Sequence, residues 1–112
     1  MTNGSSLWPW LLQRVSGLLL STGVIVHFWT LHDGGGPPVY AEVAARLVSP
    51  CWVSFYILLL AALLYHGLNG LWAVFLDFDT GHSSKSVFKT TLYVIGAFAF
   101  YTGATVLTGF SP

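Results

Sequence analysis

Charged residues are scarce in this chain. Its 112 residues include four Lys+Arg and four Asp+Glu, so 7% of the residues are charged while 54% are hydrophobic. A water-soluble domain usually carries about 25% charged residues, because it must keep its surface hydrated. The deficit excludes an ordinary soluble domain and predicts that lipid covers most of the surface. The net charge is zero and there is no basic tract, which excludes a nucleic-acid-binding protein.

Cysteine is almost absent. Cys51 is the single cysteine, which excludes an internal disulfide and any multi-cysteine metal or iron–sulfur site built by this chain alone. No lysine or arginine precedes the first apolar run, so we expect no cleavable signal peptide. No repeat or low-complexity segment divides the chain, and residues 1–112 are expected to form a single domain.

Three long apolar segments predict three transmembrane helices. They cover residues 7–31, 51–76 and 88–110. Each is long enough to cross a hydrocarbon core of about 30 Å, which takes about 20 helical residues. The sequence therefore predicts an all-α integral membrane protein.

Two polar segments separate the predicted spans. The first contains the breaker DGGGPP at 33–38, followed by VYAEVAARLV at 39–48. The apolar residues of that second stretch recur at helical spacing, which predicts a short amphipathic helix on the membrane surface. The second polar segment, DFDTGHSSKS at 77–86, is expected to be a loop.

The basic residues predict the orientation in the membrane. With three spans, the N-terminus and the second polar segment share a side, and that side holds Arg14, Lys85 and Lys89. The opposite side holds Arg46 alone among lysines and arginines. The positive-inside rule then places the N-terminus in the cytoplasm and the C-terminus outside.

The second span ends in the stretch YHGLNGLWAVFLDF, residues 65–78, which carries polar groups in an apolar helix. At about 100° per residue, His66, Gly70, Ala73 and Asp77 fall on one face. That face presents an imidazole with free space one turn away, as a bulky flat ligand would need. Axial ligation of haem iron is one interpretation, and a neutral imidazole that hydrogen-bonds between helices is the other.

A second histidine lies in the first span. His27 shares its helical face with Ser16, Leu20 and Gly23. This pattern also favours a haem ligand, and hydrogen bonding to a neighbouring helix is the alternative. Ionisable side chains within the membrane are costly and usually functional.

The two histidines are expected at different depths. His66 precedes Asp77 by eleven residues, or about 16 Å of helix, which places it near the midplane. His27 follows Arg14 by thirteen residues, or about 20 Å, which places it in the outer half.

Arg14 and its polar neighbours, including Gln13, predict a pocket at the cytoplasmic end of the first span. The alternative for Arg14 is snorkelling to lipid headgroups. Asp77 is a further candidate at the same membrane edge, and its alternatives are capping a helix or pairing with Lys85. Trp72 is a candidate to line a pocket.

These motifs resemble the small membrane-anchor subunits of succinate dehydrogenase (succinate:quinone oxidoreductase, complex II). The spacing His66–Gly70–Asp77, written H-x3-G-x6-D and followed by the aromatic Phe78, looks like their second helix. The stretch QRVSG at 13–17 is similar to the H/Q-R-x-S/T-G/A segment that opens their first helix. Three spans in little more than a hundred residues also match.

The resemblance implies that this chain is one of two membrane anchors and forms half of a larger helix bundle. The anchors would hold a flavoprotein and an iron–sulfur subunit at the membrane, and FAD and iron–sulfur clusters would belong to those partners only. His66 would be an axial ligand of haem b. Arg14 and Asp77 would lie near a quinone site, with Gln13 and Trp72 as further candidates there.

Family members with two haems take one ligand from the first helix and one from the second helix of each anchor. The resemblance then implies that His27 and His66 are both iron ligands, with the haems shared with the partner anchor. We expect two haems rather than one. The residues Gly70, Ser16 and Gly23 would then lie beside the haem.

Phe78 departs from the family pattern. Many members have a tyrosine after the aspartate, and its hydroxyl hydrogen-bonds the quinone. Phenylalanine has no hydroxyl, so the quinone could be menaquinone instead of ubiquinone, or could use another pocket.

The resulting hypothesis is a haem b-binding anchor subunit of succinate dehydrogenase in a bacterial or archaeal cytoplasmic membrane. It is a subunit of an electron-transport enzyme of the tricarboxylic acid cycle and carries no flavin or dicarboxylate motif of its own. The alternatives are a cytochrome b anchor of fumarate reductase or of another quinone oxidoreductase, and a haem-free structural subunit. A small multidrug-type transporter is a further rival, but that class has four spans and an intramembrane carboxylate.

Overall fold

In a computed structural model, the described residues of the chain form four α-helices. The structure describes residues 4–78 and 80–110, with side chains from residue 7 onward. The helices are α1 (Gly4–His32), α2 (Tyr40–Leu47), α3 (Pro50–Leu76) and α4 (His82–Thr108). By length and composition α1, α3 and α4 can cross a membrane. The predicted all-α fold with three spans and a short helix after the first is confirmed.

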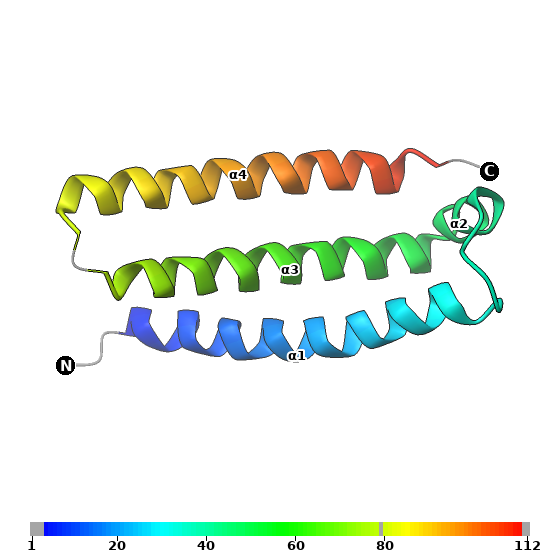
Figure 1. Cartoon of the computed structure of the whole chain (residues 1–112), viewed down its shortest axis with the longest axis horizontal. Coiled ribbons are helices and arrows are strands. Elements are labelled where there is room, and N and C mark those ends of the chain that lie inside the picture. Colours follow the sequence, from blue (N-terminus) through cyan, green and yellow to red (C-terminus); the bar gives the residue numbers. More distant parts are fainter. Residues whose placement is uncertain (1–3, 79, 111–112) are drawn as a thin grey trace.

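Helix α3 is the centre of the arrangement. It packs against both α1 and α4, and Figure 1 shows it lying between them. The short α2 lies across the end of the bundle where α4 ends (Figure 1) and contacts α3. The molecule measures 51 × 25 × 24 Å. Because α3 faces two neighbours, its side chains line two interhelical seams.

Helix α4 begins earlier than the sequence pattern predicts. The segment 77–86 was expected to be a loop, yet α4 starts at His82, where the backbone N–H of Lys85 donates to the Gly81 carbonyl at 3.1 Å. The loop prediction is wrong for its second half, and the predicted start at Phe88 is six residues late. Ser83 to Ser86 contains no glycine or proline, so a polar first turn can extend the helix beyond its apolar part.

Small residues bring the long helices close together. A Cβ atom added at Gly23 of α1 would lie 2.5 Å from the Leu59 side chain of α3. A Cβ added at Gly103 of α4 would lie 2.5 Å from Leu60. These leucines therefore pack directly onto glycine backbone, as is common between helices in membranes.

Very few side chains are buried within the described part of the chain. The buried hydrophobic residues there are Leu47, Ala62 and Leu92, and no large side chain is fully enclosed. Large apolar side chains point outward instead, with Trp29 at 71% and Phe98 at 71% exposure. A soluble monomer rarely exposes such a continuous apolar surface. The surface and the three long apolar helices identify an integral membrane protein.

Candidate functional site

His66 points from α3 into the seam with α1. Its Nδ1 atom lies 3.2 Å from the backbone oxygen of Gln13 and 3.3 Å from the Ser16 hydroxyl oxygen. Ser16 is the only buried polar side chain among those described, at 6% exposure. The imidazole is therefore held against one turn of α1 within the apolar part of the bundle.

These contacts determine the tautomer of His66. The Gln13 carbonyl oxygen can only accept a hydrogen bond, and the Ser16 hydroxyl already donates to that oxygen at 3.0 Å. Nδ1 must therefore be the donor, so in the neutral imidazole Nε2 keeps its lone pair. No hydrogen bond to Nε2 is present within the described residues. A neutral histidine whose Nδ1–H donates to a carbonyl and whose Nε2 is available is the arrangement typical of a metal ligand.

The side chain of Gln13 ties the same turn more firmly to α3. Its Nε2 donates to the backbone oxygen of His66 at 3.3 Å, and its Oε1 accepts from the Asn69 amide at 2.9 Å. Gln13 thus contacts α3 through its backbone and through both ends of its amide. Four polar residues from two helices form one connected network around His66.

Two glycines make room for this network. A Cβ added at Gly17 would lie 3.2 Å from His66 Cε1 and 3.5 Å from its Nδ1, so the ring packs closely against the α1 backbone at this position. A Cβ added at Gly70 would lie 3.5 Å from Gln13 Nε2. The space that the sequence pattern assigned to a flat ligand above Gly70 is thus occupied, in this chain alone, by the Gln13 amide.

His27 also points into the seam between α1 and α3, further along. Its Nδ1 lies 3.0 Å from the Tyr56 hydroxyl, and the two rings meet edge to face with centroids 5.4 Å apart. A hydroxyl can donate or accept, so this contact allows either tautomer of His27. Gly17 contacts His66, and His27 follows Gly17 by ten residues, so the imidazoles lie about 15 Å apart along α1. Of the small residues predicted beside His27, Ser16 belongs to the His66 network and Gly23 contacts Leu59.

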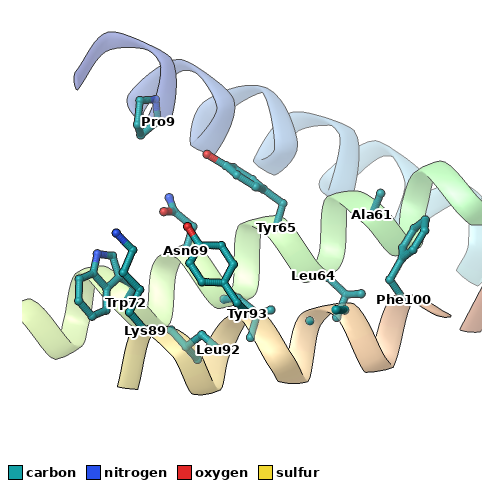
Figure 2. A pocket seen from close by; sticks show the side chains of 13 residues that line it. Pro9, Ala61, Leu64, Tyr65, Asn69, Trp72, Lys89, Leu92, Tyr93 and Phe100 are labelled. Carbon is teal, nitrogen blue, oxygen red and sulfur yellow. The ribbon is translucent and has the colours of Figure 1, made fainter. Parts of the chain in front are cut away.

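Two cavities open beside this network. A cavity of about 330 Å³ is lined by Pro9, Trp10, Gln13, Arg14 and Asn69. A larger groove of about 680 Å³ runs along the seam between α3 and α4 (Figure 2). Its lining is mainly apolar, with Asn69, Trp72 and Lys89 toward one end.

The quinone-site candidates fall in three places. Gln13 and Arg14 line the smaller cavity, where the Arg14 guanidinium lies 4.6 Å from the centroid of the Trp10 ring. Trp72 lines the larger groove. Asp77 is exposed at the C-terminal end of α3 and lines neither cavity. Arg14 and Asp77 thus do not converge on one cavity of this chain.

No cluster of three or more histidine, cysteine, aspartate or glutamate side chains is present in the described ranges 4–78 and 80–110. A metal centre built entirely by those residues is therefore absent. Single histidines that share a haem with another chain need no such cluster.

Three residues of the site were not assigned a role from the sequence pattern. Asn69 is the clearest of them, because it borders both cavities and hydrogen-bonds Gln13. The sequence feature that could have identified Asn69 is a polar amide within an apolar helix, about one turn after His66. Gly17 and Tyr56 act through contacts between helices, and no spacing within one helix could have identified those contacts.

Comparisons with known proteins agree with this architecture. A sequence model of the succinate dehydrogenase/fumarate reductase transmembrane subunit family matches residues 2–106. The chain is 34% identical over 99 residues to the succinate dehydrogenase hydrophobic membrane anchor subunit of Archaeoglobus fulgidus, covering 88% of this chain and 85% of that protein. It is 32% identical over 85 residues to the subunit of the same name from Thermoplasma acidophilum, covering 74% and 69% of the two chains.

Proposed function

The chain belongs to the succinate dehydrogenase/fumarate reductase transmembrane subunit family, and from this premise we propose that it is a haem b-binding membrane anchor of a succinate dehydrogenase. In this role it holds the catalytic subunits, a flavoprotein and an iron–sulfur protein, at the membrane together with a second anchor. The names of the two archaeal relatives support succinate dehydrogenase over fumarate reductase. Many apolar side chains of α1 and α3 face outward, so the seam between these two helices, which holds both histidines, is not covered by the rest of the described chain. This uncovered apolar surface supports the proposal that a second anchor packs there.

The observation that carries the haem proposal is the hydrogen bond from His66 Nδ1 to the Gln13 carbonyl at 3.2 Å. In the neutral imidazole this bond places the proton on Nδ1 and leaves the lone pair on Nε2, without the help of a charged partner. A metal needs that lone pair, and the carbonyl also fixes the plane of the ring. His66 would therefore be a residue that holds a haem, and another chain would supply a further ligand.

Haem b, when bound, would supply a one-electron carrier whose potential depends on its imidazoles and its burial. The chain's own residues perform simpler tasks. His66 holds its proton at Nδ1, Ser16 and Gln13 orient the ring, and Gly17 lets the ring lie against α1. His27 would hold a second haem about 15 Å further along α1, with Tyr56 orienting its ring.

The quinone end of the proposal rests on the cavity at Gln13 and Arg14. Oxidation of succinate to fumarate in the catalytic subunits releases two electrons and two protons, and reduction of a quinone to a quinol consumes the same number. Arg14 brings a positive charge beside the cavity, where negative charge develops on the quinone oxygens during reduction. With the N-terminus in the cytoplasm, this cavity lies on the side where the catalytic subunits dock.

Co-purification tests the anchor role directly. The chain, tagged at its C-terminus, is expressed together with the proposed second anchor and the catalytic subunits, and the membranes are solubilised in a mild detergent. We expect the flavoprotein and the iron–sulfur subunit to elute with the tag and to reduce quinone with succinate. If the complex assembles equally well on membranes that lack this chain, the anchor role is wrong.

A further inference from the structure

The two cavities meet at Asn69. The 330 Å³ cavity and the 680 Å³ groove share two lining residues, Pro9 of α1 and Asn69 of α3. Figure 2 shows Pro9, Asn69, Trp72 and Lys89 toward one end of the groove, while Ala61 and Phe100 lie toward the other. The smaller cavity and the groove are therefore neighbours, with the half-buried Asn69 amide between them.

The side-chain amides of Gln13 and Asn69 each have an N–H donor that the hydrogen bonds described above do not use. A side-chain amide carries two N–H donors. One N–H of Asn69 bonds to Gln13, and one N–H of Gln13 bonds to the His66 backbone oxygen. No partner for the second N–H of either amide is present among the side chains described from residue 7 onward or the backbone of residues 4–78 and 80–110. Two neutral donors are thus available beside the smaller cavity.

The chemistry of this cavity fits a flat ring with carbonyl oxygens. Trp10 offers an aromatic surface, and the second N–H groups of the Gln13 and Asn69 amides can donate hydrogen bonds to neutral carbonyl oxygens. The charges here are less suited to a phosphate, because among the described residues Arg14 is the one charged residue that lines the smaller cavity, while Lys89 lines the groove instead. A phosphate is bound best by guanidinium or ammonium groups that donate to it directly.

The groove has the length and lining for one narrow apolar chain. Asn69 and Ala61 are eight residues apart on α3, which is about 12 Å of helix. Lys89 and Phe100 are eleven residues apart on α4, or about 16 Å. The volume of about 680 Å³ lies in the range of small-molecule sites.

We propose that Asn69 is a binding residue for the headgroup of a prenylated quinone, whose tail lies in the groove between α3 and α4. The inference rests on the proposed function and adds to it a residue and a subsite. The Asn69 amide takes the place of the aromatic hydroxyl that Phe78 does not provide. Phe78 is 61% exposed and lines neither cavity, so the headgroup site lies deeper along α3 than Phe78 does.

Enzyme kinetics of the whole complex test the headgroup contact. Asn69→Leu keeps the side-chain size but removes both amide groups. We expect KM for a tailless quinone to rise about threefold to tenfold, as for the loss of one neutral hydrogen bond. Succinate oxidation with a soluble dye that accepts electrons before the quinone site should not change. Because Asn69 also holds Gln13, Asn69→Gln provides a second variant, and it should recover part of the lost affinity.

The tail subsite needs its own variant. Ala97 of α4 lines the groove, and Ala97→Phe would narrow it. Val94, also exposed on α4, does not line the groove, so Val94→Phe is the matched control. We expect Ala97→Phe to raise KM severalfold for a prenylated quinone and to leave KM for its tailless analogue unchanged. Val94→Phe should change neither value.

The outcomes separate this inference from the proposed function. If the wild-type complex oxidises succinate with the dye but reduces no quinone, both are overturned. If quinone reduction is normal and Asn69→Leu leaves KM unchanged, only the inference is overturned. If Ala97→Phe leaves both KM values unchanged while phospholipid bound per complex falls, the groove holds lipid and the tail assignment is wrong.

Discussion

The Nδ1 atom of His66 lies 3.2 Å from the backbone oxygen of Gln13, across the seam between α3 and α1. This contact joins two helices at a residue of the apolar interior and at the same time selects the tautomer of the imidazole. The contact of His27 with the Tyr56 hydroxyl does not select a tautomer. The two histidines therefore differ in how far this chain alone prepares them to bind iron.

Enlarging Gly17 should disturb the haem at His66. A Cβ there would lie 3.2 Å from Cε1 of the ring, so Gly17→Ala moves the imidazole slightly and Gly17→Val moves it further. Turning the ring off its preferred rotamer costs about 1 kcal/mol, or roughly a fivefold loss of haem affinity. Haem content and the reduced spectrum measure the effect. Gly67 has nothing within 4 Å of its added Cβ, so Gly67→Ala should leave both unchanged; equal effects of the Gly17 and Gly67 variants would contradict the packing.

Removing the Arg14 side chain should weaken quinone reduction and spare the haem. Arg14 lines the smaller cavity, and within the described part of the chain the His66 ring hydrogen-bonds to Ser16 and Gln13 and not to Arg14. A hydrogen bond from a charged donor contributes about 1.5–3 kcal/mol, so Arg14→Ala should raise KM for quinone about tenfold or more. Arg46 provides a matched control, because its guanidinium lies over the Trp52 ring at 5.5 Å near the other end of the bundle. Equal kinetics for Arg14→Ala and Arg46→Ala would remove Arg14 from the quinone site.

His27 should determine the number of haems. With both histidines as ligands, the wild-type complex contains two haems per flavin and His27→Ala contains one. Tyr56→Phe removes only the hydroxyl that faces His27 Nδ1, so it should keep both haems and shift the midpoint potential of one. A single haem in the wild type, or two in His27→Ala, would reduce His27 to a packing residue.

Restoring a hydroxyl at Phe78 should have little effect. Phe78 is 61% exposed at the end of α3 and lies outside both cavities. Phe78→Tyr should therefore leave KM for quinone within about twofold of the wild type, since an exposed substitution away from a site changes little. A marked gain in quinone affinity would place the headgroup beside Asp77 and Phe78 instead of beside Asn69.

The helices could be predicted from the sequence because the bilayer sets their length and the breakers mark their ends. The exception is the polar segment from His82 to Ser86, which is helical although its composition resembles a loop. Hydropathy identifies the part of a helix that lies in lipid, and the helix itself can continue into the headgroup region. The start of α4 depends on the backbone bond from Lys85 to Gly81, which no apolar pattern records.

The site could be predicted only in part. Helical spacing placed His66 and Gly70 on one face, and the structure keeps them on the α1 side of α3. Spacing within α3 could not reveal that the Gln13 side chain reaches over Gly70 and bonds to Asn69, because such contacts depend on how α1 and α3 are aligned. Helical spacing places Asp77 on the same face of α3 as His66, yet Asp77 lies at the exposed end of that helix.

The haem content of His66 variants tests the account most directly. The whole complex is purified, flavin is quantified, and a dithionite-reduced minus oxidised spectrum is recorded for the wild type, His66→Ala and His82→Ala. His82 is exposed at the start of α4 and controls for the loss of a histidine. We expect His66→Ala to lose one haem per flavin, while His82→Ala matches the wild type. Haem content in assembled His66→Ala equal to that of the wild type would contradict the assignment of His66 as an iron ligand.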